Sequence, residues 1–506
     1  MGDIIRLRCQ VSHDLLALPV TLDIWTDNVQ IPYLGFTIHY IDNNWIYYSR
    51  RVALSPLEEN EKDAINIKTH WCRILAQTYN VRLHEARFIC TTDSGSNVIN
   101  IFNALRCNCH RLSTIMGDVF DHPLSEVKAK AGTVTNVILF CKKLVELAKR
   151  TGKNAYLPSA LVQACTTRWT HNYFTLKSIH KNRAAIEKWL EELDNEDTMM
   201  LLDEINSFNG DLLESLIEYF GIMKTAIDCL QVTINIFISK AQHSPTIHLV
   251  WFFDVWIKKK LAGMQYEKAG TIKRLRQKLV LEDWHYWARF LHPLSKSLKD
   301  EKVDIPQKAS VLSKMKEFMK VVLSDKEERP LEIAAEEPVE DPVQNTRDAD
   351  QSFGFMTVTE NEFEIESDAP SIDQMIEDEL DRYQVRNMGK DLKRTELFDF
   401  PSRQSKDPSM QYVYFNVMKW WKENEKDFPR LATVAKYILA VQASSAESER
   451  LFSFTGCTKT KFRAAMAVQT LTALSINNGN PDLFDQELKA LVEEIKQTEA
   501  REKERM

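Results

Sequence analysis

Residues 20–52 decide the fold, and they read VTLDIWTDNVQIPYLGFTIHYIDNNWIYYSRRV. Three runs within this stretch, 20–26, 33–41 and 45–52, are rich in β-branched and aromatic residues, as strands are. Short polar turns separate the runs, and Asp-Asn-Asn at 42–44 is the clearest of them. The sequence therefore predicts a meander of three antiparallel strands.

The next residues predict how this meander continues. Residues 62–79 repeat apolar side chains at helical spacing, and 87–92 form a fourth β-rich run that ends at the polar turn 93–97. Three antiparallel strands, a crossover helix and a parallel fourth strand are the start of a ribonuclease-H-like sheet, which we expect here. Helical patterning dominates from about 98 to 325 and again from 382 to the end.

The composition excludes several classes of protein. With 506 residues, of which 44% are hydrophobic, the chain is long enough for two or three globular domains. No apolar run approaches the roughly 20 residues that span a bilayer, so we expect no membrane partner. Nine scattered cysteines predict reduced thiols in the cytoplasm or nucleus.

The net charge of −7 hides an uneven distribution. Residues 325–381 hold 20 acidic and 3 basic residues, whereas the rest of the chain holds 52 acidic and 62 basic residues. The mildly basic remainder is compatible with a polyanionic partner. The acidic segment reads as a poorly ordered linker, where limited proteolysis should cut first.

Two aspartates in the predicted sheet are candidate metal ligands. Asp23 sits in the middle of the first strand, where a buried carboxylate is costly unless it is hydrogen-bonded or binds a cation. Asp93 ends the fourth strand. The alternatives are an Asp that bonds to a turn and an Asx turn before Gly95. If the two strands are neighbours, the carboxylates converge into a cradle suited to Mg²⁺.

A third carboxylate lies in the block SSAESERLFS at 444–453. Ser444 and Glu447 have the spacing of a capping box, which gives Glu447 a structural task at a helix start. Glu449 points elsewhere around the helix and is available for another role. The alternative is that Glu449 is simply solvated.

Two further clusters have both a structural and a functional interpretation. The run Cys107-Asn-Cys-His110 has no second Cys/His pair at zinc-ligand spacing, so we favour a structural role over zinc. In TTRWT at 166–170, Arg168 can bind phosphate and Trp169 can stack on an unpaired base, or the Trp packs in the core. The basic runs 258–260 and 273–276 are solvated faces or contacts to a DNA backbone.

Together these blocks resemble the hAT superfamily of cut-and-paste DNA transposases, the hobo/Activator/Hermes group. The resemblance runs in order over most of the chain. The matching blocks are LDIWTDN (22–28), YLGFTIHY (33–40), TTDSGSN (91–97), Cys107 with His110, TRW (167–169), Trp420-Trp421, Phe428-Pro429, and SSAESERLFS (444–453) with Gly456 and Arg463. The last block looks like the hAT C-terminal dimerisation region.

The resemblance implies a catalytic and DNA-binding role for specific residues. Asp23, Asp93 and Glu449 match the family's catalytic triad, which holds two Mg²⁺ (or Mn²⁺) ions for phosphodiester cleavage and strand transfer. Trp169 matches the Trp that helps with a flipped base, and Arg168 and His110 match nearby active-site residues. The implied partners are DNA and a second copy of the chain, and the implied location is the nucleus.

The resemblance also divides the chain. We expect an α/β plus α fold, in which a ribonuclease-H-like mixed-sheet core is interrupted by a large all-helical insertion. The expected parts are 1–175 (first part of the core), 176–324 (helical insertion), 325–381 (acidic linker), 382–480 (end of the insertion, last core helix and dimerisation region) and 481–506 (charged helical tail). We expect residues 410–480 to mediate self-association, because their aromatic residues offer more apolar surface than one short helix pair can bury. The alternative is that these aromatic residues pack in the core beneath the helical insertion.

One departure from the family leaves a second function open. Family members usually carry an N-terminal BED zinc finger with paired Cys and His, and residues 1–20 do not show this pattern. The alternative is therefore a catalytically inactive, domesticated transposase that acts as a dimerising nuclear regulator.

Overall fold

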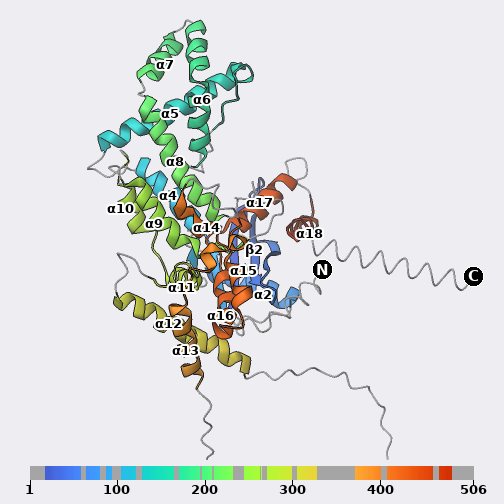
Figure 1. Cartoon of the computed structure of the whole chain (residues 1–506). Coiled ribbons are helices and arrows are strands. Elements are labelled where there is room, and N and C mark those ends of the chain that lie inside the picture. The colour runs from blue at the N-terminus through green and yellow to red at the C-terminus, as the bar shows by residue number, and fades with distance from the viewer. Residues whose placement is uncertain are drawn as a thin grey trace, which may run out of the picture.

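A computed structural model describes most of the 506-residue chain (Figure 1). The described residues are 17–57, 64–79, 87–93, 104–120, 128–163, 170–193, 196–207, 210–231, 244–262, 264, 270–298, 305–327, 371–399, 407–459 and 466–480.

A five-stranded mixed sheet forms the centre of the molecule. Its strands are β1 (Ala17–Thr26), β2 (Pro32–Ile41), β3 (Tyr47–Pro56), β4 (Arg87–Thr92) and β5 (Leu105–Arg106). Their order is β3-β2-β1-β4-β5, with antiparallel β3–β2 and β2–β1 pairs and parallel β1–β4 and β4–β5 pairs. The predicted meander and parallel fourth strand are confirmed. The sequence missed β5, because two residues are too few to show a period.

Helices make up most of the remainder. They are α2 (Ala64–Tyr79), α4 (Asn108–Phe120), α5 (Lys128–Arg150), α6 (His171–Leu193), α7 (Glu196–Ser207), α8 (Gly210–Leu230), α9 (Leu249–Leu261), α10 (Thr271–Lys278), α11 (Asp283–Leu291), α12 (Ile305–Glu327), α13 (Ile372–Val385), α14 (Gln411–Tyr414), α15 (Val417–Asn424), α16 (Pro429–Ala440), α17 (Ala446–Thr458) and α18 (Val468–Gly479). Figure 1 shows that α5, α6 and α7 project away from the sheet.

The third strand begins two residues later than its composition predicted. The Asp42 carboxylate accepts hydrogen bonds from the backbone N–H groups of Asn44 and Ile46, at 2.9 and 2.8 Å, which closes an Asx turn. Trp45 lies in this turn with φ of 62°. Its indole N–H donates to Glu425 at 2.8 Å, so Trp45 fastens the hairpin to the helices instead of pairing in the sheet.

The two faces of the sheet pack against different helices. Alternate side chains of β1 and β2, such as Leu22 and Phe36, pack on Trp71 of α2, and the rings of Phe36 and Trp71 are 5.5 Å apart. The other face carries Tyr33 and is covered by α16, α17 and α18. Because strand side chains alternate between faces, Asp23 lies on the same face as its register partner Gly35, toward α17.

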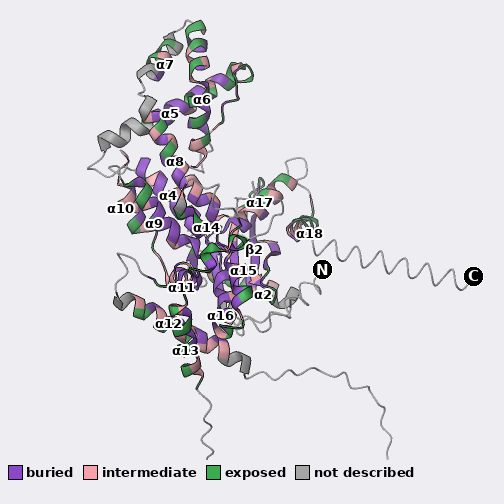
Figure 2. Ribbon diagram, viewed as in Figure 1, coloured by how far each residue is buried: buried purple, intermediate pink, exposed green. Residues whose placement is uncertain are grey.

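The aromatic residues of the C-terminal part lie inside the molecule. The exposed fraction of all five is between 0 and 8%, and they are Tyr412, Phe415, Trp420, Trp421 and Phe428. Most of them join a core cluster with α11, α12, α13 and α16, within the buried centre that Figure 2 colours purple. The expectation that these side chains form a self-association surface is therefore wrong, because they bury one another within the chain.

The acidic segment 325–381 is helical at both ends, which its composition did not predict. Helix α12 continues to Glu327 and α13 begins at Ile372, so both ends of 325–381 are helical. Residues 328–370 and the tail 481–506 lie outside the described residues. Among the helices that the structure describes, none is both long enough and apolar enough to span a bilayer.

Candidate functional site

The sheet places Asp23 and Asp93 side by side. Strands β1 and β4 run parallel, and Thr21 is opposite Thr91 in their register. Asp23 and Asp93 each follow two residues later, so they lie at the same level and on the same face. This is the carboxyl end of two neighbouring parallel strands, where ligand-binding groups gather in α/β sheets.

Helix α17 brings Glu449 to the same place from the far end of the chain. Leu451 and Phe452 pack α17 on the sheet. Their side chains approach Gly35 so closely that a Cβ at this position would lie within 2.8 Å of both. Because Gly35 is opposite Asp23 in the β1–β2 register, the helix crosses the sheet at the position of Asp23. The absence of a side chain at position 35 therefore lets Glu449 approach Asp23.

The pKa of Asp23 is raised by burial and by the neighbouring carboxylates. Burial and then the charge of Asp93 raise it from 3.8 to about 8, and Glu449 and Cys107 add smaller increases. A hydrogen bond from the Ile24 N–H to the carboxylate, at 2.8 Å, works in the opposite direction. Asp93 and Glu449 are thus near enough to Asp23 for their charges to raise its pKa.

The three side chains have the chemistry of magnesium ligands, but they are not grouped closely enough to hold one ion. All three groups are carboxylates, the hard oxygen ligands that Mg²⁺ prefers. Within the described residues, no three His, Cys, Asp or Glu side chains are grouped closely enough to hold one ion. The structure therefore does not show a ready-made metal site at these residues.

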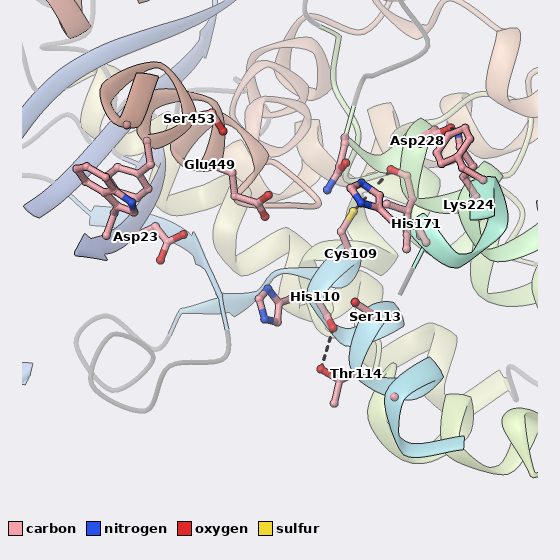
Figure 3. A pocket seen from close by; sticks show the side chains of 18 of the residues that line it. Asp23, Cys109, His110, Ser113, Thr114, His171, Lys224, Asp228, Glu449 and Ser453 are labelled. Atoms are coloured by element: carbon pink, nitrogen blue, oxygen red, sulfur yellow. Dashed lines mark hydrogen bonds and ion pairs between the residues drawn. The ribbon is translucent and has the colours of Figure 1, made fainter. Parts of the chain in front are cut away.

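Asp23 and Glu449 open onto a pocket of about 1120 Å³. Figure 3 shows their carboxyl groups facing the same space, with the His110 ring beside them at the start of α4. The far wall is formed by α6 and α8, including Phe174, which is 40% exposed, and Lys224. Such a volume accommodates far more than a pair of ions, so the pocket has room for a large substrate.

Two of the predicted DNA-binding residues cannot be placed. Arg168 and Trp169 lie outside the described residues. Thr170 and His171, which follow them directly, line the pocket. The third predicted residue, His110, is exposed and lies at the pocket beside the carboxylates.

The pocket contains a residue that the sequence argument missed. Trp25 lines it and stacks on Phe452 of α17, with ring centroids 6.0 Å apart. Since Trp25 is two residues after Asp23 on the same strand, the alternation of β1 places both on one face. That alternation was the signal from which Trp25 could have been found.

Cys107 and Cys109 join separate parts of the fold. Both are buried, at 0 and 4% exposure. The Cys107 Sγ accepts a hydrogen bond from the Ser445 N–H at 3.4 Å, and the Cys109 thiol donates to the Ile227 carbonyl at 3.7 Å. A hydrogen bond from Cys109 is the main cause that lowers the pKa of Cys107 to about 6. These contacts agree with the structural interpretation of the motif.

The predicted capping box at the start of α17 is wrong. The N-cap of α17 is Ser445, and its side chain makes no capping bond. Ser444 Oγ donates instead to the Leu230 carbonyl at 3.2 Å, and Glu447 forms an ion pair with Arg450. Glu447 keeps a structural role, but its partner is Arg450, one turn further along α17.

Intramolecular carboxylates neutralise part of the two basic runs, 258–260 and 273–276. The pairs are Lys258 with Asp254 at 2.6 Å, Lys260 with Asp407 at 2.8 Å, and Arg274 with Asp118 at 3.3 Å. These three cations therefore contribute less to a polyanion-binding surface than their density in the sequence predicted.

We expect Gly35→Ala to weaken the docking of α17. An added Cβ would stand 2.7 Å from Phe452 Cε1 and 2.8 Å from Leu451 Cδ2, and such overpacking costs about 1–3 kcal/mol. Gly456→Ala is the matched control in α17, because its Cβ meets Trp25 at an ordinary 3.6 Å. Urea unfolding measures both variants, and equal stabilities of the two would contradict this packing.

We expect Asp23→Asn to stabilise the metal-free protein at pH 8. The pKa of Asp23 is raised in the folded chain to about 8 from 3.8, so the stability associated with its protonation is full below pH 4 and is lost as pH rises toward 8. Thermal unfolding in chelator should show a Tm higher by about 1–3 °C for the variant at pH 8, and no difference near pH 4. A lower Tm of the variant at pH 8 would contradict the repulsion.

Comparison with known proteins identifies the C-terminal part. Residues 400–480 match the family model described as the hAT family C-terminal dimerisation region. This range contains α14 to α18, and therefore the helix that carries Glu449.

Most of the chain is similar in sequence to transposases. It is 24% identical to the transposable element Hobo transposase of Drosophila melanogaster over 469 residues, which are 85% of this chain and 65% of the relative. It is 20% identical to the putative AC transposase of Zea mays over 482 residues, 90% of this chain and 55% of the relative. The chain thus spans between about half and two thirds of the length of these relatives. The chain is therefore similar to these transposases over most of its length, and its residues 400–480 match the hAT family C-terminal dimerisation region.

Proposed function

We propose that this chain cleaves and joins DNA phosphodiesters in a metal-dependent reaction, as a hAT-type transposase or a protein derived from one. The observation that carries the proposal is the convergence of Asp23, Asp93 and Glu449. Two neighbouring strands and a helix more than 350 residues later in the chain deliver these carboxylates to one end of the sheet. Like charges on these three half-buried side chains are costly to keep close together, which favours a role in binding cations.

We further propose that the sheet is the core of a ribonuclease-H-like domain. The order β3-β2-β1-β4-β5, with two antiparallel and two parallel pairs, supports this architecture. So does the position of α17, which packs on the sheet after a long series of helices has intervened.

The proposed cofactor is Mg²⁺ or Mn²⁺, and Asp23, Asp93 and Glu449 would have to stand closer together than they do in this structure to hold one ion. When bound, divalent metal ions activate the attacking oxygen and stabilise the leaving oxygen of an in-line displacement. The chain's own carboxylates would fix where the reacting phosphate stands. A cation would also offset the repulsion that raises the pKa of Asp23.

The proposed substrate is DNA, and the shape of the pocket supports it. His110 stands beside the carboxylates at the open side, where it can donate a hydrogen bond to a phosphate oxygen. Trp25 and Phe452 form an apolar wall at the same end. The residues adjoining Arg168 and Trp169 line the pocket, which supports their proposed roles toward phosphate and base.

We also propose that the chain self-associates through the region 400–480 and acts in the nucleus, where its DNA partner resides. The description of the matched family model supports self-association. Because the aromatic side chains of this region are buried, the interface would use other surfaces of α15 to α18. Light scattering of the full chain at micromolar concentration tests this point.

The central experiment measures nicking of supercoiled plasmid by the full chain in Mg²⁺, Mn²⁺ or chelator. We expect nicked product with either metal and none in chelator. Fluorescence anisotropy with a labelled duplex, measured in Ca²⁺, reports DNA binding separately. Binding without cleavage in both metals would overturn the enzymatic proposal and leave the DNA-binding regulator.

A further inference from the structure

A short buried segment connects α16 to α17 and determines where Glu449 stands. Residues 441–445 are neither helix nor strand, and all five are buried. Glu449 follows in the first turn of α17. Any shift of this segment therefore moves the start of the helix and the Glu449 carboxylate with it.

The catalytic edge of the sheet holds one side of the segment. The Thr91 hydroxyl donates to the Gln442 carbonyl at 2.9 Å. The Asn108 backbone N–H and side-chain amide both donate to the Ala443 carbonyl, at 2.9 and 3.1 Å. Together with the bond from Ser445 to Cys107, these contacts tie the segment to the ends of β4 and β5.

The part of the chain between α4 and α14 contacts the segment 441–445 at two places. The Ala443 N–H donates to the Thr246 hydroxyl at 3.0 Å, and that hydroxyl donates to the Gln442 side chain at 3.4 Å. Near the end of α8, the Leu230 carbonyl accepts from Ser444, and the Gln231 carbonyl accepts from Arg450. These two points are the two ends of the connection between α8 and α9.

We infer that Thr246 is a positioning residue for Glu449, and that through it the helical part of the chain controls the assembly of the three-carboxylate site. Thr246 is 1% exposed and lies three residues before the start of α9 at Leu249. Its hydroxyl contacts both the Ala443 backbone and the Gln442 side chain, so it fixes both the position and the orientation of the segment 441–445. This inference rests on the proposed function of Glu449.

The physical reason is the narrow tolerance of a catalytic site. A buried N–H that loses its acceptor is left with an uncompensated desolvation cost. We therefore expect the segment to shift until the Ala443 N–H finds another acceptor. A displacement of about 1 Å at a reacting group can cost on the order of 10²-fold in rate. A ligand that moves the end of α8 or the start of α9 would act on Glu449 by the same route.

The test uses Thr246→Val, which keeps the shape of the side chain and removes both hydrogen bonds. We expect kcat for plasmid nicking to fall about 10–100-fold with KM for DNA unchanged, because Glu449 moves while the pocket remains. Thr246→Ser restores the hydroxyl and should recover most of kcat. Thr271→Val is the matched control: Thr271 is equally buried at the start of α10, and its hydroxyl contacts Tyr219 at 3.4 Å instead.

A second readout needs no activity and no metal. Hydrogen exchange followed by mass spectrometry should show faster exchange of peptides covering 441–450 in Thr246→Val than in wild type or Thr271→Val. If wild type does not nick DNA, the proposed function fails, yet the exchange result still decides whether Thr246 holds the segment. Unchanged exchange in 441–450, or a kcat for Thr246→Val equal to that of a nicking wild type, would overturn the inference.

Discussion

Glu449→Gln should abolish metal-dependent nicking, with a loss of at least about 10³-fold in kcat. The amide keeps the size and hydrogen-bonding capacity of the side chain but lacks the negative charge that would hold a cation. Glu449 is one of the charges that raise the pKa of Asp23, so its removal should lower that pKa. The fold should persist, because the apolar contacts of Leu451 and Phe452 dock α17.

The control is the same substitution at an exposed position. Glu214 lies on α8 with 67% of its side chain exposed and pairs with His180 at 3.8 Å, so Glu214→Gln should nick DNA like wild type. Glu447→Gln should cost an intermediate amount, since Glu447 pairs with Arg450 near the segment 441–445. Nicking by Glu449→Gln at the wild-type rate would assign the activity to other residues.

Lys459→Met should lower the free energy of unfolding by about 3–5 kcal/mol, as expected when one partner of a buried ion pair is removed. Lys459 Nζ donates to Asp27 Oδ2 at 2.6 Å and to the Tyr33 hydroxyl at 2.8 Å. Both charged side chains are buried, at 5 and 1% exposure. Burial opposes the charge of Asp27, but the bonds from Lys459 and from the turn N–H groups outweigh it and lower its pKa.

The pair matters for function because Lys459 caps the end of α17 and Asp27 closes the turn after β1. The Lys459–Asp27 pair holds the C-terminal end of α17, whereas Thr246 contacts the segment that precedes its N-terminal end. Lys436→Met is the matched control, because Lys436 pairs at 2.7 Å with Glu425, which is 38% exposed, and such pairs are worth about 0–1 kcal/mol. Equal losses in the two variants, measured by urea unfolding, would refute a special role for the buried pair.

Some expectations failed because the sequence does not say what lies opposite a residue. The aromatic run from Tyr412 to Phe428 has the composition of a core and of an interface alike. The structure buries these rings against α11, α12, α13 and α16, which are distant in sequence. In the same way, Ser444 has the spacing of a capping box with Glu447, but its hydroxyl donates to the Leu230 carbonyl, which is 214 residues away.

The sequence by itself determined the parts of the site that depend on local rules. The alternation in residues 20–52 established the meander, and the placement of Asp23 and Asp93 followed from where their strands run and end. Only the tertiary structure decided which contacts hold Glu449, because Thr246 and Lys459 meet partners that are 197 and 432 residues away. Hydrogen bonds and ion pairs of that range leave no period or spacing in a sequence, whereas strands and helices repeat at fixed intervals.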